Sequence, residues 1–463
     1  PSFKKMKDYR FLFLSFAQIF LCMKRLIFFT LLICAALQVR AQWGGDTDFN
    51  IHGYARGSVY GGSKTYDLTS VFAELSLQAS LKKGPAILQS DIRFNTGIFF
   101  NENDTRIRIR ELYAGYKSRK FDVFLGNQIV IWGRMDGFNP TNNITPNDYF
   151  FLSPDPADQQ QSNFMLKMQY RPLPAIDIEL VAIPFYKMSS YRFDLFDMGE
   201  LGNYLLFGDD MLPERILANG TYAVRANFDY PAFGGSVSWF QGYDPYHGFN
   251  VVSVNWASAQ PVIRIASTPY RKSTIGADVA IPVGNFMIVR AEAAYNHTKN
   301  PDKKMFIPNP DISYVVGIET NVLGCIIIGQ YIGKYTFDFF QLTAPVSPGQ
   351  NDPASLIQYA EKYIDYENRM FNRKVFNQQE RTNHAVSLTI TRSFAYDVLS
   401  AECTGYYNIT SKEWFVRPKL SWRISDALMA AVGGNYMRGG ENTLYGYSSA
   451  VMNGAFAELK VIF

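Results

Sequence analysis

The sequence predicts an all-β fold: a transmembrane, antiparallel, up-and-down β-barrel of about 18 strands. Apolar and polar residues alternate with a period of two in segment after segment, as in a strand whose two faces meet different environments. Most of these segments have about 10 residues, the length that a tilted strand needs to cross a bilayer. Short turns alternate with longer polar loops, and a soluble sandwich would have no reason to sort its connections in this way.

The alternation is clearest from Val71 to Leu81, where the odd positions are apolar and the even positions from Glu74 to Ser80 are polar. Segments 86–98 and 414–424 repeat the pattern, with charged residues again on the second face. The same criteria predict strands at 49–60, 70–81, 86–99, 106–117, 121–132, 162–171, 176–186, 220–229, 235–243, 273–281, 285–297, 311–322, 325–335, 382–393, 397–408, 413–424, 428–437 and 450–463. The count is even, which places both ends of the barrel in the periplasm.

The connections fall into two classes. Short turns are predicted at 82–84, 118–120, 172–175, 230–234, 282–284, 323–324, 394–396 and 425–427. Mostly longer loops are predicted at 61–69, 100–105, 133–161, 187–219, 244–272, 298–310, 336–381, 409–412 and 438–449. The segment from Pro261 to Ser267 also resembles a strand, but we assign it to a loop because counting it would invert the direction of every later strand.

Two residues do not fit their predicted strands. Pro418 lies in the middle of a strand, where it removes a hydrogen-bond donor, and we expect a bulge there. Glu111 falls on the lipid-facing register of the segment that contains Arg106, Arg108 and Arg110. Either a bulge shifts the register at that point or the strand begins later than predicted.

Both ends of the chain carry targeting features. Met23-Lys24-Arg25, the apolar run 26–37 and Val39-Arg40-Ala41 are typical of a cleaved signal peptide, so residues 1–41 are predicted to be an upstream extension and leader and residues 42–463 a single barrel domain. Alternating residues before Phe463 resemble the closing strand of an outer-membrane barrel, which implies recognition by the barrel assembly machinery. Cys325 and Cys403 lie on strands that are not neighbours, and no disulfide is predicted.

Composition agrees with a membrane barrel and narrows the function. Aromatic residues make up 16% of the chain, which suits girdles at two membrane interfaces. A formal charge of +4 over 463 residues lacks the concentrated basic surface that nucleic acid requires. We expect contact with outer-membrane lipid and with a small organic or lipid-like solute, and no nucleic-acid partner. The oligomeric state stays open.

Charged residues of both signs fall on the predicted inward register, and they are the candidate pore lining. The candidates are Asp91, Arg93, Arg106, Arg108, Arg110, Lys167, Arg290, Glu292, Arg417, Lys419 and Arg423. The densest cationic group, from Arg93 to Arg110 on two neighbouring strands, is expected to attract anions. The alternative is that paired charges form a wet lining that only holds the wall rigid.

Aromatic residues gather in three long loops and are candidates for a constriction or lid. The loops are 133–161, 187–219 and 336–381; the first candidates are Trp132, at the end of the strand 121–132, and Asp136, in the loop 133–161. Tyr359 and Tyr363 belong to the loop 336–381, where Asp352 and the following proline predict the start of a helix. The alternatives are that these loop aromatics pack on one another, and that Trp132 is an interface residue at a strand end.

The segment Gly126 to Gly133 has the pattern Gly-x-Gln-x-x-x-Trp-Gly and is followed by Asp136 and Asn139-Pro140. It resembles a porin-like family of uncharacterised Gram-negative outer-membrane β-barrel proteins, and residues 290–295 resemble a second segment of that family. The resemblance implies a barrel that moves or binds organic, lipid-like or polymeric molecules.

The sequence therefore predicts a porin-like channel in the outer membrane whose charged lumen is gated by aromatic-rich loops. A surface receptor or assembly scaffold with a plugged barrel is the alternative. An outer-membrane hydrolase is less favoured because His384 lacks a serine two positions later, and Asp244 with His247 is a weak acid–histidine pair. No catalytic residue, metal site or cofactor is predicted.

Overall fold

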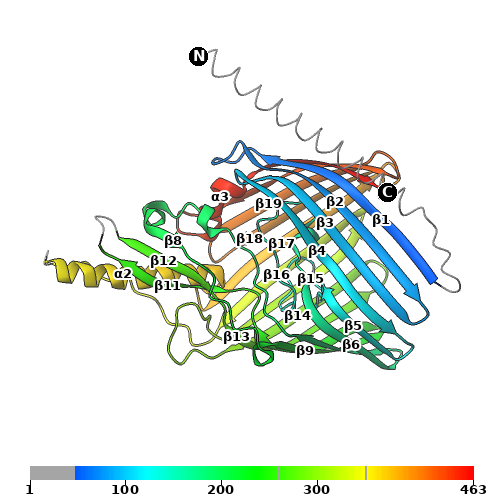
Figure 1. Cartoon of the computed structure of the whole chain (residues 1–463), viewed down its shortest axis with the longest axis horizontal. Helices are drawn as coiled ribbons and strands as arrows, with labels where there is room; N and C mark the ends of the chain where they lie inside the picture. The colour runs from blue at the N-terminus through cyan, green and yellow to red at the C-terminus, as the bar shows by residue number, and fades with distance from the viewer. Residues whose placement is uncertain (1–46, 258–260, 350–351) are drawn as a thin grey trace, which may run out of the picture.

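The structure, a computed structural model, describes residues 47–257, 261–349 and 352–463, so the predicted leader lies outside the described residues. Eighteen strands form one sheet (Figure 1). They are β1 (Thr47–Gly61), β2 (Leu68–Lys83), β3 (Ala86–Phe99), β4 (Glu102–Lys117), β5 (Phe121–Gln128), β6 (Asn163–Leu173), β7 (Ile176–Ile183), β9 (Thr221–Tyr230), β10 (Phe233–Tyr243), β13 (Arg271–Val283), β14 (Met287–Thr298), β15 (Asp311–Val322), β16 (Cys325–Thr336), β17 (Thr382–Phe394), β18 (Leu399–Asn408), β19 (Glu413–Arg423), β20 (Leu428–Arg438) and β21 (Gly454–Ile462).

The sheet closes into a barrel. Each barrel strand pairs antiparallel with the barrel strand that follows it in the chain, and β21 pairs with β1 from Tyr54↔Ile462 to Gly61↔Ala455. Gly53 and Phe463 exchange two backbone hydrogen bonds, of 2.9 and 3.0 Å, beyond the last pair of the ladder. The predicted fold class, an up-and-down barrel of about 18 strands, is confirmed. Recognition of Phe463 by assembly machinery stays a prediction.

The barrel is apolar outside and polar inside, the reverse of a soluble fold. Ile107 and Ile275 are 70% and 58% exposed, whereas Glu74 and Asn95 are fully buried. Such a wall is stable only when its outer surface faces lipid, and closure satisfies every backbone group there. Exposed aromatic residues form a band near each rim: Tyr116, Phe121, Tyr230, Phe233, Phe286 and Phe394 at one end, and Phe164, Tyr222, Tyr295, Tyr335, Tyr407 and Tyr436 at the other.

The connections separate the two ends of the barrel. At the turn end they are two to four residues long, whereas at the loop end most are longer. The predicted loop 100–105 is wrong, because β3 and β4 are joined by Phe100 and Asn101 alone, both with positive φ (49° and 64°), as in a two-residue hairpin turn. In barrels of this kind the turn end faces the periplasm and the loop end faces outwards.

Two predicted strands each extend four residues too far at one end, and the predicted strand 176–186 ends three residues earlier, at Ile183. β5 ends at Gln128 rather than at residue 132, because the backbone N–H groups of Val130 and Trp132 bond the side chains of Thr145 and Asn142 instead of a neighbouring strand. The predicted strand 450–463 begins at Gly454, because residues 444–452 form helix α3 (Leu444–Met452), whose first turn is capped by Thr443.

The two anomalous residues have different explanations. Asp91 pairs with Glu111 and Ile92 pairs with Ile109, so Arg110 is an extra residue, and this bulge turns Glu111 inwards. At Pro418 the predicted bulge is wrong. The register of β19 against β20 is the same on both sides of this proline, and only the ladder pairs at positions 417 and 418 are missing.

The loop end carries a folded layer of its own (Figure 1). Helix α2 (Pro353–Val375) begins as predicted, with Asp352 accepting a hydrogen bond from Ser355 N at 3.0 Å. Beside it lies a three-stranded sheet of β8 (Leu205–Phe207), β12 (Val262–Thr268) and β11 (Gly248–Asn255). The segment that starts at Pro261 is thus a strand, but it lies outside the barrel, and the direction of the later strands is as predicted. Among the described residues no helix is long and apolar enough to span a membrane. Cys325 and Cys403 are free thiols.

Candidate functional site

One connection, residues 129–162 between β5 and β6, folds into the barrel, and we call it the lumen loop. Its Phe138 stacks on Tyr406 of β18 at a ring-centroid distance of 5.1 Å, while its Asp158 contacts β1 and β3. It also reaches β14, almost opposite β1 in the ring of strands. The lumen loop therefore crosses the interior and narrows it.

Asp158 of the lumen loop is buried and forms ion pairs with two arginines. It lies in a 3₁₀ turn (Pro156–Gln159) that Asp155 caps by accepting a hydrogen bond from Ala157 N. Its two carboxylate oxygens contact Arg56 Nη1 and Arg93 Nη1, each at 2.7 Å. Burial raises the pKa of Asp158, but the two guanidinium groups lower it by a larger amount. The pKa of Asp158 therefore lies below its usual range. This side chain is therefore a carboxylate at neutral pH.

Glu74 of β2 completes the cluster from the wall. One carboxylate oxygen lies 2.7 Å from Arg56 Nη2 and accepts a hydrogen bond from Tyr54 OH at 2.8 Å. The other accepts hydrogen bonds from Asn95 Nδ2 at 2.6 Å and Arg108 Nη2 at 3.0 Å. Glu74 is fully buried, so its charge depends on these partners. Asp91 and Glu458 add contacts to Arg93 (3.1 Å) and Arg56 (3.3 Å).

Two further arginines hold the backbone of the lumen loop. Arg110 of β4 donates to the carbonyl oxygens of Ala157 (2.8 Å) and Gln160 (3.2 Å). Arg417 of β19 donates to those of Ser153 (2.7 Å) and Pro154 (2.9 Å). A planar guanidinium with several fixed N–H groups suits such paired contacts. The predicted cationic group therefore serves largely as an anchor for the loop.

The first part of the lumen loop is fixed to the far wall. Glu292 of β14 accepts hydrogen bonds from the backbone N–H and hydroxyl of Thr141, both at 2.8 Å, and from Arg134 N at 3.1 Å. The guanidinium of Arg134 contacts Asp278 at 2.8 Å, and Asp136 pairs with Arg290 at 2.7 Å. The loop thus has polar anchors on two nearly opposite walls.

Trp132 is an internal anchor and does not lie at the membrane interface. It is 1% exposed and packs with the inward-facing Met165, Val181 and Phe240 of the wall. Its indole N–H donates to Glu179 at 2.6 Å. Burial of so large a ring with a satisfied N–H holds the start of the loop against β6, β7 and β10.

The outer part of the lumen loop packs on aromatic residues of the wall. Phe150 and Phe151 belong to a buried cluster with Phe72, Phe99 and Val451. Phe151 also lies 3.8 Å below the guanidinium carbon of Arg108, measured to the ring centre. Within the described ranges, no group of three or more histidine, cysteine, aspartate or glutamate residues could hold a metal ion.

Solved structures share this architecture. Pseudomonas aeruginosa OccK5 (OpdH) aligns with a TM-score of 0.50 and 11% identity over 90% of this chain and 97% of that chain. Acinetobacter baumannii OccAB3 gives 0.51 and 10% over 90% and 98%. The outer membrane protein opdK from Pseudomonas aeruginosa gives 0.51 and 9% over 90% and 97%. The chain shares the β-barrel fold of these proteins. No protein-family model and no curated protein matches the sequence.

The other candidate lining residues lie apart from the ion pairs around Asp158 and Glu74. Arg106 pairs with Asp104 near the loop end, with 37% and 36% of their side chains exposed. Lys419 pairs with Glu402 at 3.0 Å. Lys167 lies over the ring of Phe124 at 5.1 Å. Arg423 is exposed at the turn end of β19.

The aromatic residues predicted for the loop 336–381 lie away from the residues that hold the lumen loop. Tyr359 and Tyr363 are on α2, in the outer layer, with their ring centres 6.1 Å apart. Sequence reasoning missed Arg56, Arg134 and Asp158. Arg56 shares the period-two face of Tyr54 and Ser58, a signal that could have identified it. For Asp158 the only local signal is the Asp155-Pro156 pair that starts its 3₁₀ turn.

Proposed function

We propose that this protein is a porin-like channel of the outer membrane, which passes small organic solutes past the lumen loop. The observation that supports it most directly is the attachment of this loop to two nearly opposite walls, by Asp158 at one side and by Thr141 at the other. A loop fixed in this way narrows a wide barrel, and a barrel of 16–18 strands has room for an aqueous passage beside it.

The wall chemistry supports polar or charged organic solutes. Arginines and carboxylates both line the interior, and their mutual pairing leaves neither sign in large excess around the lumen loop. The Lys419–Glu402 pair is partly exposed, with side-chain exposures of 19% and 30%. A lining of this kind offers both donors and acceptors to a passing solute. We therefore expect weak charge selectivity.

The test is conductance of the purified mature barrel in planar lipid bilayers. We expect discrete steps of current, with a reversal potential close to zero in a salt gradient. The matched variant lacks residues 353–375, which form α2 in the outer layer. A folded barrel that gives no current steps, either intact or without α2, would reject the channel.

A surface receptor or assembly scaffold is the second candidate, and the outer layer favours it. Phe193, Phe249, Ile263 and Ile364 form a buried core between α2 and the small sheet, more structure than a simple pore entrance needs. The bilayer experiment separates the two functions, because a receptor with a closed lumen would remain silent after removal of α2.

A further inference from the structure

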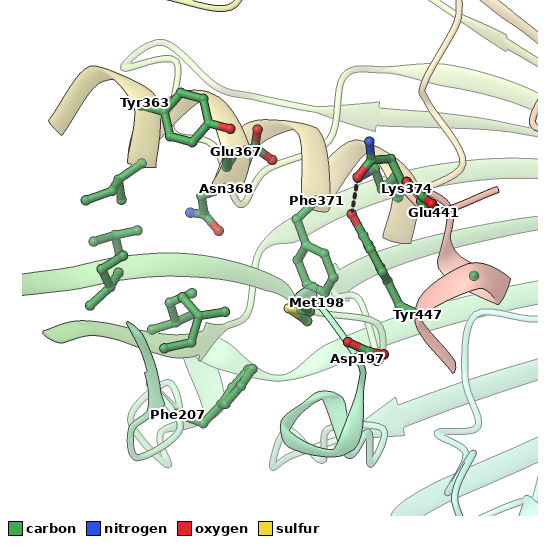
Figure 2. A pocket seen from close by; sticks show the side chains of 17 residues that line it. Asp197, Met198, Phe207, Tyr363, Glu367, Asn368, Phe371, Lys374, Glu441 and Tyr447 are labelled. Atoms are coloured by element: carbon green, nitrogen blue, oxygen red, sulfur yellow. Dashed lines mark hydrogen bonds between the residues drawn. The ribbon is translucent and has the colours of Figure 1, made fainter. Parts of the chain in front are cut away.

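The outer layer contains a pocket that is separate from the residues that hold the lumen loop (Figure 2). Its cavity volume is about 550 Å³, and its walls come from α2, from the three strands β8, β11 and β12, and from residues 197–198 and 441–447. Four loop-end connections thus meet around one space. Pockets of this size hold molecules of a few hundred daltons.

One side of the pocket is apolar. Phe371 and Ile364 of α2 face the small sheet across the cavity, and both belong to the core of the outer layer or pack against it. The remaining apolar lining consists of Met198, Leu205, Phe207, Val251, Ile263 and Ile265. Burial of apolar surface contributes about 25 cal/mol per Å², so the body of a ligand here must be aliphatic or aromatic.

The polar groups of the pocket lie towards α2 and α3. The described residues that line it include three carboxylates, from Asp197, Glu367 and Glu441, and one ammonium, from Lys374. Lys374 donates a hydrogen bond to Tyr447 OH at 2.8 Å. The lining charge is therefore net negative, which favours a cationic group on the ligand.

A second, independent feature favours a hydrogen-bond donor. Asn368 is 5% exposed, and Figure 2 shows its amide extending from α2 towards the cavity. Its nitrogen donates to the carbonyl oxygen of Phe249 at 3.1 Å. Its Oδ1 atom accepts no hydrogen bond from any of the described residues. An unsatisfied buried acceptor is unfavourable unless a donor reaches it.

We propose that this outer pocket binds a small amphipathic amine: an aliphatic or aromatic body seated against Phe207, Ile263 and Phe371, and a protonated amine near Glu367 and Asn368. The site lies on the outer face of the molecule and does not depend on whether the lumen conducts. It would hold such a cation at the cell surface.

The test uses three probes with the same body and different heads: 4-phenylbutylamine, 4-phenylbutanol and 4-phenylbutanoate. Binding to the full barrel in lipid nanodiscs is measured by calorimetry, with the heat of empty nanodiscs subtracted. We expect the amine to bind at least tenfold more tightly than the acid, with the alcohol between them. Equal binding of the three probes, tighter binding of the acid, or no saturable binding of the amine overturns the proposal.

Two pairs of variants locate the site. Val251→Phe places a ring in the cavity, whereas Val252→Phe changes the next residue, which is 50% exposed and does not line the pocket. Glu367→Gln removes a lining carboxylate, and Glu361→Gln removes one elsewhere on α2. We expect the first of each pair to weaken binding of the amine by tenfold or more and the second to leave it unchanged. Amine binding that survives both Val251→Phe and Glu367→Gln places the ligand elsewhere and rejects the site.

Discussion

Arg56 and Asp158 form a buried ion pair, with Arg56 Nη1 2.7 Å from Asp158 Oδ2, although 102 positions separate them in the sequence. Arg56 belongs to the first strand of the barrel and Asp158 to the lumen loop, and they are 4% and 7% exposed. Loss of one partner from a buried ion pair strongly destabilises the folded protein. This contact therefore holds the loop at the point where it crosses the lumen.

Replacing Asp158 with asparagine should release this end of the lumen loop. The substitution keeps the shape of the side chain but leaves Arg56 and Arg93 without the charge that both contact. Loss of one partner from a buried pair costs about 3–5 kcal/mol. We expect larger and noisier single-channel currents from Asp158→Asn in planar bilayers.

Asp155→Asn is the matched control, because it removes one negative charge from the same loop. Asparagine is as good an N-cap as aspartate, so the hydrogen bond from Ala157 N is retained and the current should match that of the unchanged protein. If Asp158→Asn also conducts like the unchanged protein, the ion pair does not hold the constriction.

Arg110→Lys separates anchoring from charge. Lysine keeps the positive charge but cannot hold the carbonyl oxygens of Ala157 and Gln160 together as the guanidinium does. We expect conductance to rise while the reversal potential in a salt gradient stays the same. The measurement is single-channel current recorded at several voltages.

Arg106→Lys serves as the comparison on the same strand, because Arg106 pairs with Asp104 near the loop end, and within the described residues it forms no ion pair with the lumen loop. Its conductance should be unchanged. A shift in reversal potential without a rise in conductance for Arg110→Lys would show that Arg110 acts on passing ions and that its contacts with the loop are secondary.

The barrel could be predicted from sequence because the alternation of apolar and polar residues within each strand indicates which face meets lipid and which faces the interior. Leu75 and Glu74 are neighbours in one strand, so they face opposite sides of the barrel wall whichever strands pair with it, and the sequence alternation indicates this directly. Even the bulge left a signal, since Glu111 would face lipid if the alternation of Arg106, Arg108 and Arg110 continued. The segment from Pro261 needed a different argument: counting it as a barrel strand would invert the direction of every later strand.

The site was harder to predict because it depends on where a loop goes. Nothing in the residues around Asp158 specifies that they meet Arg56 and Arg93, since that contact requires the closed barrel first. Trp132 could be singled out, but its burial against Met165 and Phe240 depends on the loop turning inwards. Long-range polar contacts of this kind have no short sequence pattern.

Acid should loosen the outer layer through His247. This side chain is 2% exposed between the rings of Tyr191 and Phe249, and burial lowers its pKa to about 4, although nearby Asp244 raises it. Because the pKa in the folded state lies below that in the unfolded state, the stability is complete above about pH 6.5 and falls as the pH drops towards 4. The loss at pH 5 should be about 2 kcal/mol.

The measurement is limited proteolysis of the loops at pH 7.5 and pH 5. We expect faster cleavage at pH 5 for the unchanged protein and a smaller pH effect for His247→Phe, which keeps an aromatic ring in place. His297→Phe changes an exposed histidine on β14 and should behave like the unchanged protein. An equal pH effect in all three would assign the acid response to other groups.

Deletion of Arg110 should be tolerated by the barrel, although deletion of one residue from a strand normally reverses the faces on one side of it. Arg110 is the extra residue of the bulge, so its removal brings Ile109 and Glu111 into a continuous ladder with Ile92 and Asp91. Deletion of Ile107 instead turns Arg106 or Arg108 towards lipid, at a cost of up to about 2–4 kcal/mol that falls towards the membrane interfaces. The folded fraction after refolding, read from the heat-dependent shift on gels, should therefore stay high for the first deletion and fall for the second. Equal folding of both would mean that the bulge does not set the register of β4.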